Sequence, residues 1–245
     1  MLEMLIFFDE FCKKNDLEYW LDGGTLLGAI RHGGFIPWDD DLDVDMPYPD
    51  CVKLVKLFSD RQIGDYVLQT HRTDEGYYRF WPVLRDTKSE YLHEDDLYTE
   101  KTLKFRGCQI DVFPVVPRYG KNVMKVNLFT KKVVNYLWMK QPQYNSLLLN
   151  FAFYGANKVI YPLLRLYVKP KDEHLTFDFG VGFEKEDRVK SEIFPLGEVV
   201  FEGYKFKAPG NPIAYCKRIY GDNCMEMPTG KQIYNHHVQI DFKNK

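Results

Sequence analysis

The chain has 245 residues, of which 45% are apolar and 28% charged, and its formal net charge is −2. This length is sufficient for one large domain, or for a domain with a substantial insertion, whose core needs no disulfide or metal to be stable. The balanced composition, without any low-complexity tract, excludes intrinsically disordered and fibrous proteins.

The cysteines and the first residues indicate a reducing compartment. The five cysteines are odd in number and form no C-x-x-C pair, which argues against a disulfide framework and a structural zinc site. The opening MLEMLIFFDEF has acidic residues where a secretory signal has basic ones. No apolar run reaches the roughly 18 residues of a membrane span. We therefore expect a soluble, cytoplasmic protein that can still lie on the inner face of a membrane.

Periodicity predicts alternating helices and short strands in the first half of the chain. Apolar side chains recur at helical spacing over residues 1–14, whereas LDVDM at 42–46 alternates apolar and acidic residues, as a strand with one polar face does. Gly23 and Gly24 separate a strand from a helix. The expected strands are 17–21, 42–46, 66–69, 78–84, 90–92 and 109–113, and the expected helices are 1–14, 25–31 and 50–58.

The second half is expected to be helical at first and irregular at its end. Two long helices are predicted over 127–139 and 147–167, and a short one over 212–220. EVVFEGYKF at 198–206 predicts a hairpin around Gly203, and the residues after 220 are expected to form an irregular tail. The predicted fold class is α+β.

Charge is distributed unevenly along the chain. Residues 112–171 contain ten basic side chains and no Asp or Glu, so the rest of the chain has 23 basic against 35 acidic residues. This block is also rich in aromatic residues, and the two features together indicate attraction to a polyanion or to an anionic membrane surface. A helical subdomain with aromatic core residues and solvated lysines explains them equally well, and both interpretations stay open.

The densest chemical signal is WDDDLDVD at 38–45, in which five carboxylates lie within seven residues. Like charges this close are unfavourable without a cation, and Asp41 and Asp43 project from one face of the predicted strand with room for a cation between them. Such oxygen ligands suit Mg²⁺ or Mn²⁺ at a site for phosphoryl transfer. An Asp-rich turn or a calcium loop is the alternative, although the EF-hand pattern does not match. Asp45 is expected to be a solvated neighbour.

Two further elements complete a recognisable pattern. Gly23-Gly24-Thr25 opens a helix after a strand, which lets backbone N–H groups approach an anion. Asp111, in QIDVFP, lies between apolar residues as in a half-buried strand. A glycine turn, a D-x-D strand and a carboxylate on a later strand together are the core pattern of the nucleotidyltransferase fold.

The block YWLDGGTLLGAIRHGGFIPWDDDLDVDM closely resembles the signature of the LicD/fukutin family, and QIDVFPVVP, FEGYKFKAP, IYGDN and the late His236-His237 are similar to its weaker markers in the same order. The resemblance implies a nucleotidyltransferase-like mixed sheet flanked by helices. It also implies transfer of a substituted phosphate, such as phosphocholine or a polyol phosphate, from a CDP-linked donor. The expected acceptor is a glycan hydroxyl or its lipid-linked precursor, and no nucleic acid is expected as a partner.

The resemblance also implies roles for particular residues. Asp41, Asp43 and Asp111 are expected to be catalytic and to bind Mg²⁺ or Mn²⁺, with Asp39 as a supporting acid. Tyr48 and Asp45 depart from the family pattern, and these departures affect which donor is expected but not which type of reaction. Expected donor contacts are the phosphate-side loop of Gly23, Gly24 and Thr25, together with Arg31, His32, Trp38, Arg85 and His236. If the donor carries a quaternary ammonium, the aromatic candidates for contacting it are Tyr77, Tyr78 and Trp81.

Three segments are expected: a catalytic core over 1–117, a cationic helical insertion over 118–175 on the acceptor or membrane side, and a C-terminal part over 176–245 that completes the catalytic domain. Two rival functions remain at this point. The glycine and aspartate pattern alone would also suit a nucleotidyltransferase that uses an NTP and releases pyrophosphate. A non-enzymatic module that binds a glycan through calcium is the other alternative.

Overall fold

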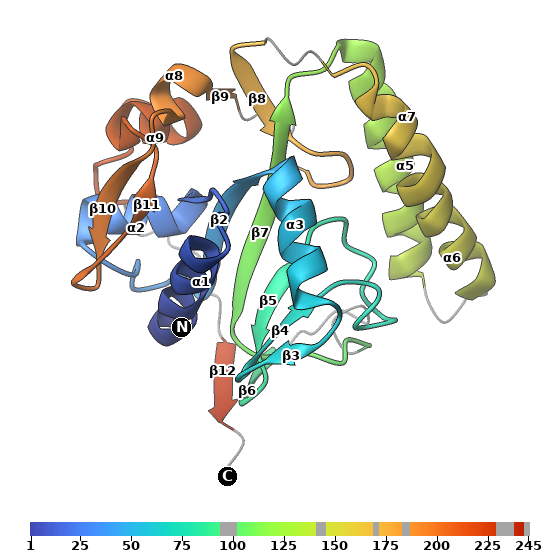
Figure 1. Ribbon diagram of the computed structural model, residues 1–245, viewed down its shortest axis with the longest axis horizontal. Helices are drawn as coiled ribbons and strands as arrows, with labels where there is room; N and C mark the ends of the chain where they lie inside the picture. The colour runs from blue at the N-terminus through green and yellow to red at the C-terminus, as the bar shows by residue number, and fades with distance from the viewer. Residues whose placement is uncertain (94–101, 141–145, 169–171, 183–186, 229–237, 243–245) are drawn as a thin grey trace.

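A mixed sheet runs through the centre of the molecule and carries helices on its faces and edges (Figure 1). This computed structural model describes residues 1–93, 102–140, 146–168, 172–182, 187–228 and 238–242. The α+β class predicted from the sequence is confirmed. The strands of the main path, in spatial order, are β1 (Trp20–Leu21), β2 (Leu42–Pro47), β7 (Gln109–Pro117), β5 (Val83–Asp86), β4 (Tyr66–Gln69) and β3 (Gln62–Ile63), and the sheet is extended from β7 by β8 (His174–Phe177) and β9 (Arg188–Val189).

The sheet is organised around β7 and its neighbour β2. These two strands run parallel, whereas the other strand pairs of the sheet are antiparallel. β7 also pairs with β5 and β8, and its inner positions are buried. The register places Asp43 directly opposite Asp111. Paired residues of adjacent strands project from the same face of a sheet, so this register brings two of the expected site carboxylates together.

Three N-terminal helices cover the sheet. α1 buries Met4, Leu5, Phe8 and Cys12, which is the spacing of one helical face. α3 begins two residues earlier than expected, because Pro49 is tolerated in the first helical turn, where its missing N–H has no helical partner. The helices are α1 (Leu2–Lys14), α2 (Gly23–His32) and α3 (Tyr48–Phe58).

A helical subdomain stands beside the sheet (Figure 1). We give this name to α5 (Lys121–Met139), α6 (Ser146–Gly155), the π-helical turn η1 (Ala156–Ile160) and α7 (Tyr161–Arg165). It packs through two apolar clusters: Val134 and Phe153 contribute to the first, together with Tyr77 and Tyr78, and Tyr161 contributes to the second. Part of its aromatic content is therefore core, as the second interpretation of this block expects. The division of the chain at 117 and 175 stays a prediction.

The C-terminal part returns to the N-terminal half. The expected hairpin and the expected helix over 212–220 are confirmed as β10 (Gly197–Phe201), β11 (Tyr204–Ala208) and α9 (Pro212–Tyr220), which follow the short α8 (Lys190–Ile193). The tail expected to be irregular contains β12 (Val238–Phe242), which pairs with β6 (Ser89–His93). The strand expected over 78–84 begins only at Val83, since Tyr78 before it packs against the helical subdomain instead of pairing.

All five cysteines are free and buried. Within the described ranges, no helix combines the length and the apolar character needed to span a bilayer.

A buried ion-pair network joins the C-terminal part to the sheet. Arg188 is fully buried; its Nη2 lies 2.5 Å from Oδ2 of Asp22, and its Nε lies 2.6 Å from Oδ2 of Asp45. The hydroxyl of Tyr215 donates to Asp22 at 2.7 Å and to Asp45 at 3.2 Å. The expectation that Asp45 is a solvated neighbour is wrong, because β2 continues into the core beyond Asp43 and buries the next acidic side chain.

Replacing Arg188 tests this network. Arg188→Met should lower the free energy of unfolding by about 3–5 kcal/mol, because it leaves two carboxylates buried without their cation. Urea unfolding followed by circular dichroism measures the loss. Arg218→Met is the matched control, since Arg218 pairs with Glu192 near the surface and should cost about 1 kcal/mol or less. Equal losses in both variants would contradict a structural role for Arg188.

Candidate active site

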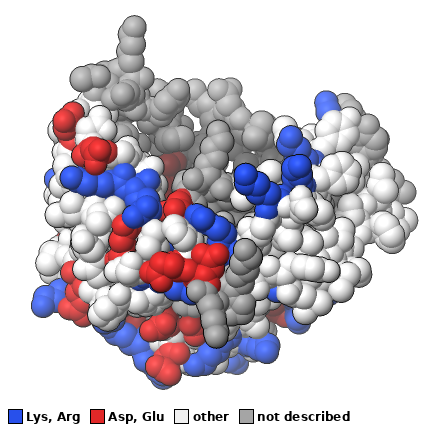
Figure 2. Space-filling model, turned by 90° about the horizontal axis from the view of Figure 1, so that it is seen from above, with Lys and Arg blue, Asp and Glu red and all other residues white. Residues whose placement is uncertain are grey.

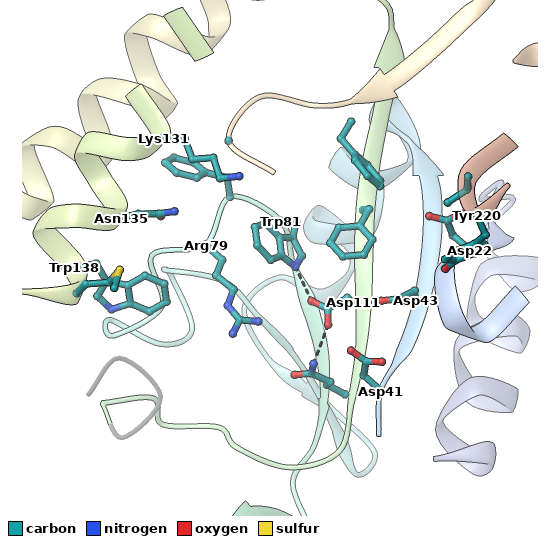
Figure 3. A pocket seen from close by; sticks show the side chains of 18 residues that line it. Asp22, Asp41, Asp43, Arg79, Trp81, Asp111, Lys131, Asn135, Trp138 and Tyr220 are labelled. Atoms are coloured by element: carbon teal, nitrogen blue, oxygen red, sulfur yellow. Dashed lines mark hydrogen bonds between the residues drawn. The ribbon is translucent and has the colours of Figure 1, made fainter. Parts of the chain in front are cut away.

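A cavity of about 610 Å³ lies between the sheet and α5 (Figure 3). One wall is acidic and is formed by β2, β7 and the start of α2, with Asp41, Asp43 and Asp111 exposed to the cavity. The opposite wall carries Lys131 from α5 and Arg79 from the loop before β5. The cavity therefore places cations across from a group of carboxylates.

The acidic wall brings together three carboxylates that are distant in the sequence. Oxygen atoms of Asp41, Asp43 and Asp111 all lie within 4.8 Å of one another. The β2–β7 register causes this, since it pairs Asp43 with Asp111 and leaves Asp41 just before β2 on the same side. Asp39, Asp40 and Asp41 form a second, more exposed group with the same spacing.

Glycines at the start of α2 make room for these carboxylates. Gly23 has a φ of +54°, and a Cβ at this position would collide with the carboxylate of Asp43. A Cβ at Gly24 would collide with the carboxylate of Asp39. Only glycine accepts both the backbone conformation at 23 and this close approach. Of this expected phosphate-side loop, Gly23 lines the cavity.

Thr25 holds the acidic strand in place. Its side chain is buried, and its Oγ1 accepts a hydrogen bond of 2.8 Å from the backbone N–H of Asp43. The backbone N–H of Asp22 in turn donates to the carbonyl of Asp43 at 3.1 Å. Thr25 thus acts on the strand and does not line the cavity, contrary to the donor contact expected for it.

The carboxylate of Asp111 is held by two donors. Trp81 Nε1 donates to Oδ1 at 2.6 Å, and Gln109 Nε2 donates to Oδ2 at 2.9 Å (Figure 3). Hydrogen bonds to an ionised group are among the strongest in proteins, and two of them fix the plane of the carboxylate. Asp111 is therefore an oriented acceptor at the edge of the cavity.

Burial and mutual repulsion perturb the acidic wall. Burial, followed by the nearby charges of Asp39 and Asp111, raises the pKa of Asp41 from its ordinary value of 3.8 to about 8. Burial and the charges of Asp41 and Asp111 also raise the pKa of Asp43 well above its ordinary value. Carboxylates that resist ionisation together are stabilised as anions by a bound cation. The oxygen-only set within 4.8 Å fits a hard divalent ion such as Mg²⁺ or Mn²⁺.

The other expected donor contacts lie away from the cavity. Arg31 donates to the carbonyl oxygens of Cys224 and Glu226, at 3.2 and 3.3 Å, and so fastens the segment after α9. His32 and Trp38 contact each other edge to face, with ring centroids 6.0 Å apart. None of these three expected contacts lines the cavity. His236 lies outside the described residues.

Arg85 has a structural environment. It is buried, its Nε donates to Gln69 Oε1 at 2.8 Å, and its Nη1 donates to the carbonyl of Gly107 at 2.9 Å. These bonds tie β5 to β4 and to the chain that leads into β7. The structure does not bring Arg85 to the cavity, so the diphosphate contact expected for it is not supported.

The aromatic candidates separate in the same way. Tyr77 and Tyr78 are buried; their hydroxyls donate to the Trp81 carbonyl and to Asn150 Oδ1, both at 2.7 Å. Trp81 lines the cavity, where the guanidinium of Arg79 lies 5.6 Å from its ring centroid. Only Trp81 of the three is therefore placed to meet a ligand.

Several lining residues escaped sequence reasoning. Gln109 could have been found, because it lies two residues before Asp111 and so shares its face of β7. Arg79 lies in an irregular loop without any motif. Lys131, Asn135 and Trp138 recur along one face of α5, but periodicity does not reveal that this face borders a cavity.

Three converging carboxylates on an α+β sheet are an arrangement suited to the class of enzymes that transfer phosphate groups. Sequence comparison adds the family. Residues 16–146 match the family described as "LicD/FKTN/FKRP, nucleotidyltransferase domain". The chain belongs to this family, which confirms the resemblance seen in the signature block.

Three relatives show how far the similarity extends. The chain is 42% identical over 252 residues to "Lipopolysaccharide cholinephosphotransferase LicD" of Haemophilus influenzae, with 97% of this chain and 93% of that protein covered. It is 56% identical over 104 residues to "Ribitol 5-phosphate transferase FKRP" of Homo sapiens, with 42% of this chain and 18% of the human protein covered. A match of 35% over 75 residues to "Mannosyltransferase regulator 4" of Saccharomyces cerevisiae covers 31% of this chain and 6% of that protein.

The raised pKa of Asp41 predicts how stability depends on pH. Because the pKa is about 8 in the folded protein and 3.8 ordinarily, the folded state binds more protons between these values, and the free energy of unfolding falls as pH rises from about 4 to about 8. Asp41→Asn should flatten this fall in metal-free buffer and should be more stable than wild type at pH 8. Thermal unfolding between pH 5 and 8 in the presence of a chelator measures both curves.

Asp65→Asn serves as the control, because Asp65 forms an exposed pair with Lys88. Parallel wild-type and Asp41→Asn curves would count against repulsion in the acidic wall.

Proposed function

We propose that this protein is a metal-dependent transferase that moves a substituted phosphate from a CDP-linked donor to a hydroxyl of a glycan or its lipid-linked precursor, releasing CMP. One observation carries the proposal: the oxygens of Asp41, Asp43 and Asp111 converge within 4.8 Å in a cavity whose opposite wall is cationic. The names of two relatives, a cholinephosphotransferase and a ribitol 5-phosphate transferase, support a substituted phosphate as the transferred group.

Asp41 and Asp43, with Asp111 beside them, would hold Mg²⁺ or Mn²⁺ at the acidic wall. A divalent ion there would supply Lewis-acid stabilisation of the charge that develops on a departing CMP. Asp39 would support the same group from its position against Gly24. The raised pKa values of Asp41 and Asp43 support this assignment, since a cation relieves the repulsion that raises them.

Asp111 would also accept the proton of the attacking hydroxyl. Its two hydrogen bonds, from Trp81 and Gln109, hold its carboxylate in one orientation, which general-base catalysis requires. Arg79 and Lys131 across the cavity would attract the diphosphate of the donor and position it for in-line attack.

The rival functions make less use of these features. A calcium-dependent glycan-binding module requires neither the crowding of Gly23 and Gly24 against carboxylates nor a third, hydrogen-bonded carboxylate on β7. A nucleotidyltransferase that uses NTP would be recognised by its product, since it releases pyrophosphate and not CMP.

A donor panel tests the proposal directly. The protein is incubated with CDP-choline, CDP-ribitol, CDP-glycerol and CTP, each with a glycan acceptor, in the presence of Mg²⁺ or a chelator, and CMP and pyrophosphate are quantified. We expect CMP release from a CDP-linked donor that depends on the divalent ion and on the acceptor. Pyrophosphate release from CTP alone would favour the nucleotidyltransferase alternative.

Loss of single carboxylates should abolish turnover on the active donor. Asp43→Asn and Asp111→Asn should each retain less than about a tenth of wild-type kcat/KM, which corresponds to roughly 1.4 kcal/mol or more of transition-state stabilisation. The exposed Asp65→Asn should keep full activity. Wild-type activity in either site variant would remove that residue from the proposed mechanism.

Trp81 is predicted to act by positioning Asp111. Trp81→Phe keeps an aromatic ring but removes the N–H donor, and a hydrogen bond to a charged group is worth about 1.5–3 kcal/mol. We expect kcat to fall roughly 10- to 100-fold with little change in the KM for the donor. Trp20→Phe is the control, because the indole N–H of buried Trp20 has no hydrogen-bond partner among the described residues and Trp20 does not line the cavity. A rise in KM without a fall in kcat would assign Trp81 to donor binding instead.

A further inference from the structure

The outer side of α5 is apolar and exposed. Val126, Phe129, Val133 and Tyr136 recur every three or four residues and form one stripe, in which Phe129 is 70% exposed. The neighbouring side of the same helix, about 100° around its axis, buries Asn127, Thr130, Val134 and Leu137. The apolar outer stripe therefore lies beside the buried side of the helix and is exposed in the part of the chain that the structure describes.

A second apolar stripe lies on α6, η1 and α7, which follow one another without a break in the chain. Leu147, Phe151 and Tyr154 on α6 are followed at helical spacing by Val159, Leu163 and Leu166, and all six are exposed. Phe151 and Leu166 each expose 78% of their area. We call the exposed stripe of α5 and the exposed stripe of α6, η1 and α7 together the apolar helical face. Exposed apolar surface of this extent is unusual on a monomeric protein and marks an interaction site.

The charges around this face have one sign. Lys121, Lys125, Lys132 and Lys158 on the same helices are exposed, as is Lys140 directly after α5, and residues 112–171 include no Asp or Glu. In Figure 2 the surface over the helical subdomain, on the right, is mostly white, with blue basic residues beside it. Two copies joined through this face would bring like charges together, whereas an anionic bilayer complements both the lysines and the apolar side chains.

The apolar helical face adjoins the catalytic cavity. A hollow of about 400 Å³ is lined by Lys132 and Tyr136 on the outer side of α5 and by Lys131, Asn135 and Met139, and the last three also line the cavity. A surface that docks through this face therefore lies next to the cavity.

We infer that the apolar helical face is a membrane-docking surface, which inserts its aromatic and aliphatic side chains at the headgroup level of an anionic bilayer while the flanking lysines contact lipid phosphates. This inference goes beyond the proposed transferase activity and does not depend on it. In this arrangement Phe129, Phe151 and Leu166 insert into the bilayer, whereas Lys131 lines the cavity.

Co-sedimentation of the full chain with liposomes tests the inference. Vesicles of phosphatidylcholine alone are compared with vesicles that also contain phosphatidylglycerol, at low and high salt. We expect binding to the anionic vesicles that weakens as salt rises. A Phe129→Ser/Phe151→Ser/Leu166→Ser variant should bind about tenfold or more weakly, because insertion scales with buried apolar area. Circular dichroism verifies that each variant is folded.

A matched control separates insertion from general stickiness. Val200, Tyr204 and Ile213 are each 51% exposed on β10, β11 and α9, and replacing all three by Ser should leave binding unchanged. A Lys125→Gln/Lys132→Gln/Lys158→Gln variant should weaken binding mainly at low salt. Absence of binding to anionic vesicles at low salt would overturn the inference. So would a dimer in lipid-free solution that the apolar variant dissociates. Neither outcome bears on CMP release, so the transferase proposal is judged separately.

Discussion

The geometry of the acidic wall depends on one interaction, the buried ion pairing of Arg188 with Asp22 and Asp45. Asp22 immediately precedes Gly23, and Asp45 lies two residues beyond Asp43, so the ion pair ties the start of α2 to β2 on either side of the site. Two buried carboxylates without a cation would be costly, and the cation comes from β9, outside the residues 16–146 that match the family. The signature block therefore carries the ligands, but a distant segment holds them in register.

One short run of acidic residues meets two different physical environments. Asp45 shares Arg188 with Asp22 and forms a structural ion pair. Asp41 and Asp43 face Asp111, and burial together with repulsion raises their pKa values. A divalent cation would relieve the repulsion among Asp41, Asp43 and Asp111, whereas Asp45 already has the cation of Arg188 beside it. In the sequence Asp41, Asp43 and Asp45 look alike, since they alternate with apolar residues in one strand pattern. Their roles differ because β7 places Asp111 opposite Asp43, whereas β9 places Arg188 against Asp45.

This contrast shows what could be predicted and why the rest could not. Local patterns identified the glycine turn, the D-x-D strand and Asp111, because period-two alternation and glycine placement are properties of neighbouring residues. Arg85 was assigned to the donor by its charge alone, yet it forms buried hydrogen bonds to Gln69 and Gly107. Thr25 was assigned to phosphate and instead accepts from the backbone of Asp43. Arg79 and Lys131 reach the cavity through tertiary packing of a loop and a helix, for which no local pattern exists.

The position of α5 gives one helix two tasks. Phe129 and Lys131 are two residues apart and so lie about 200° apart around the helix axis. The ammonium of Lys131 borders the cavity, while Phe129 belongs to the apolar helical face. Docking through that face would consequently leave the cavity side of α5 unobstructed. Met139, which lines both the cavity and the adjoining hollow, lies where the two surfaces meet. If the face docks on a bilayer as inferred, the cavity that holds the carboxylates would lie next to the membrane surface.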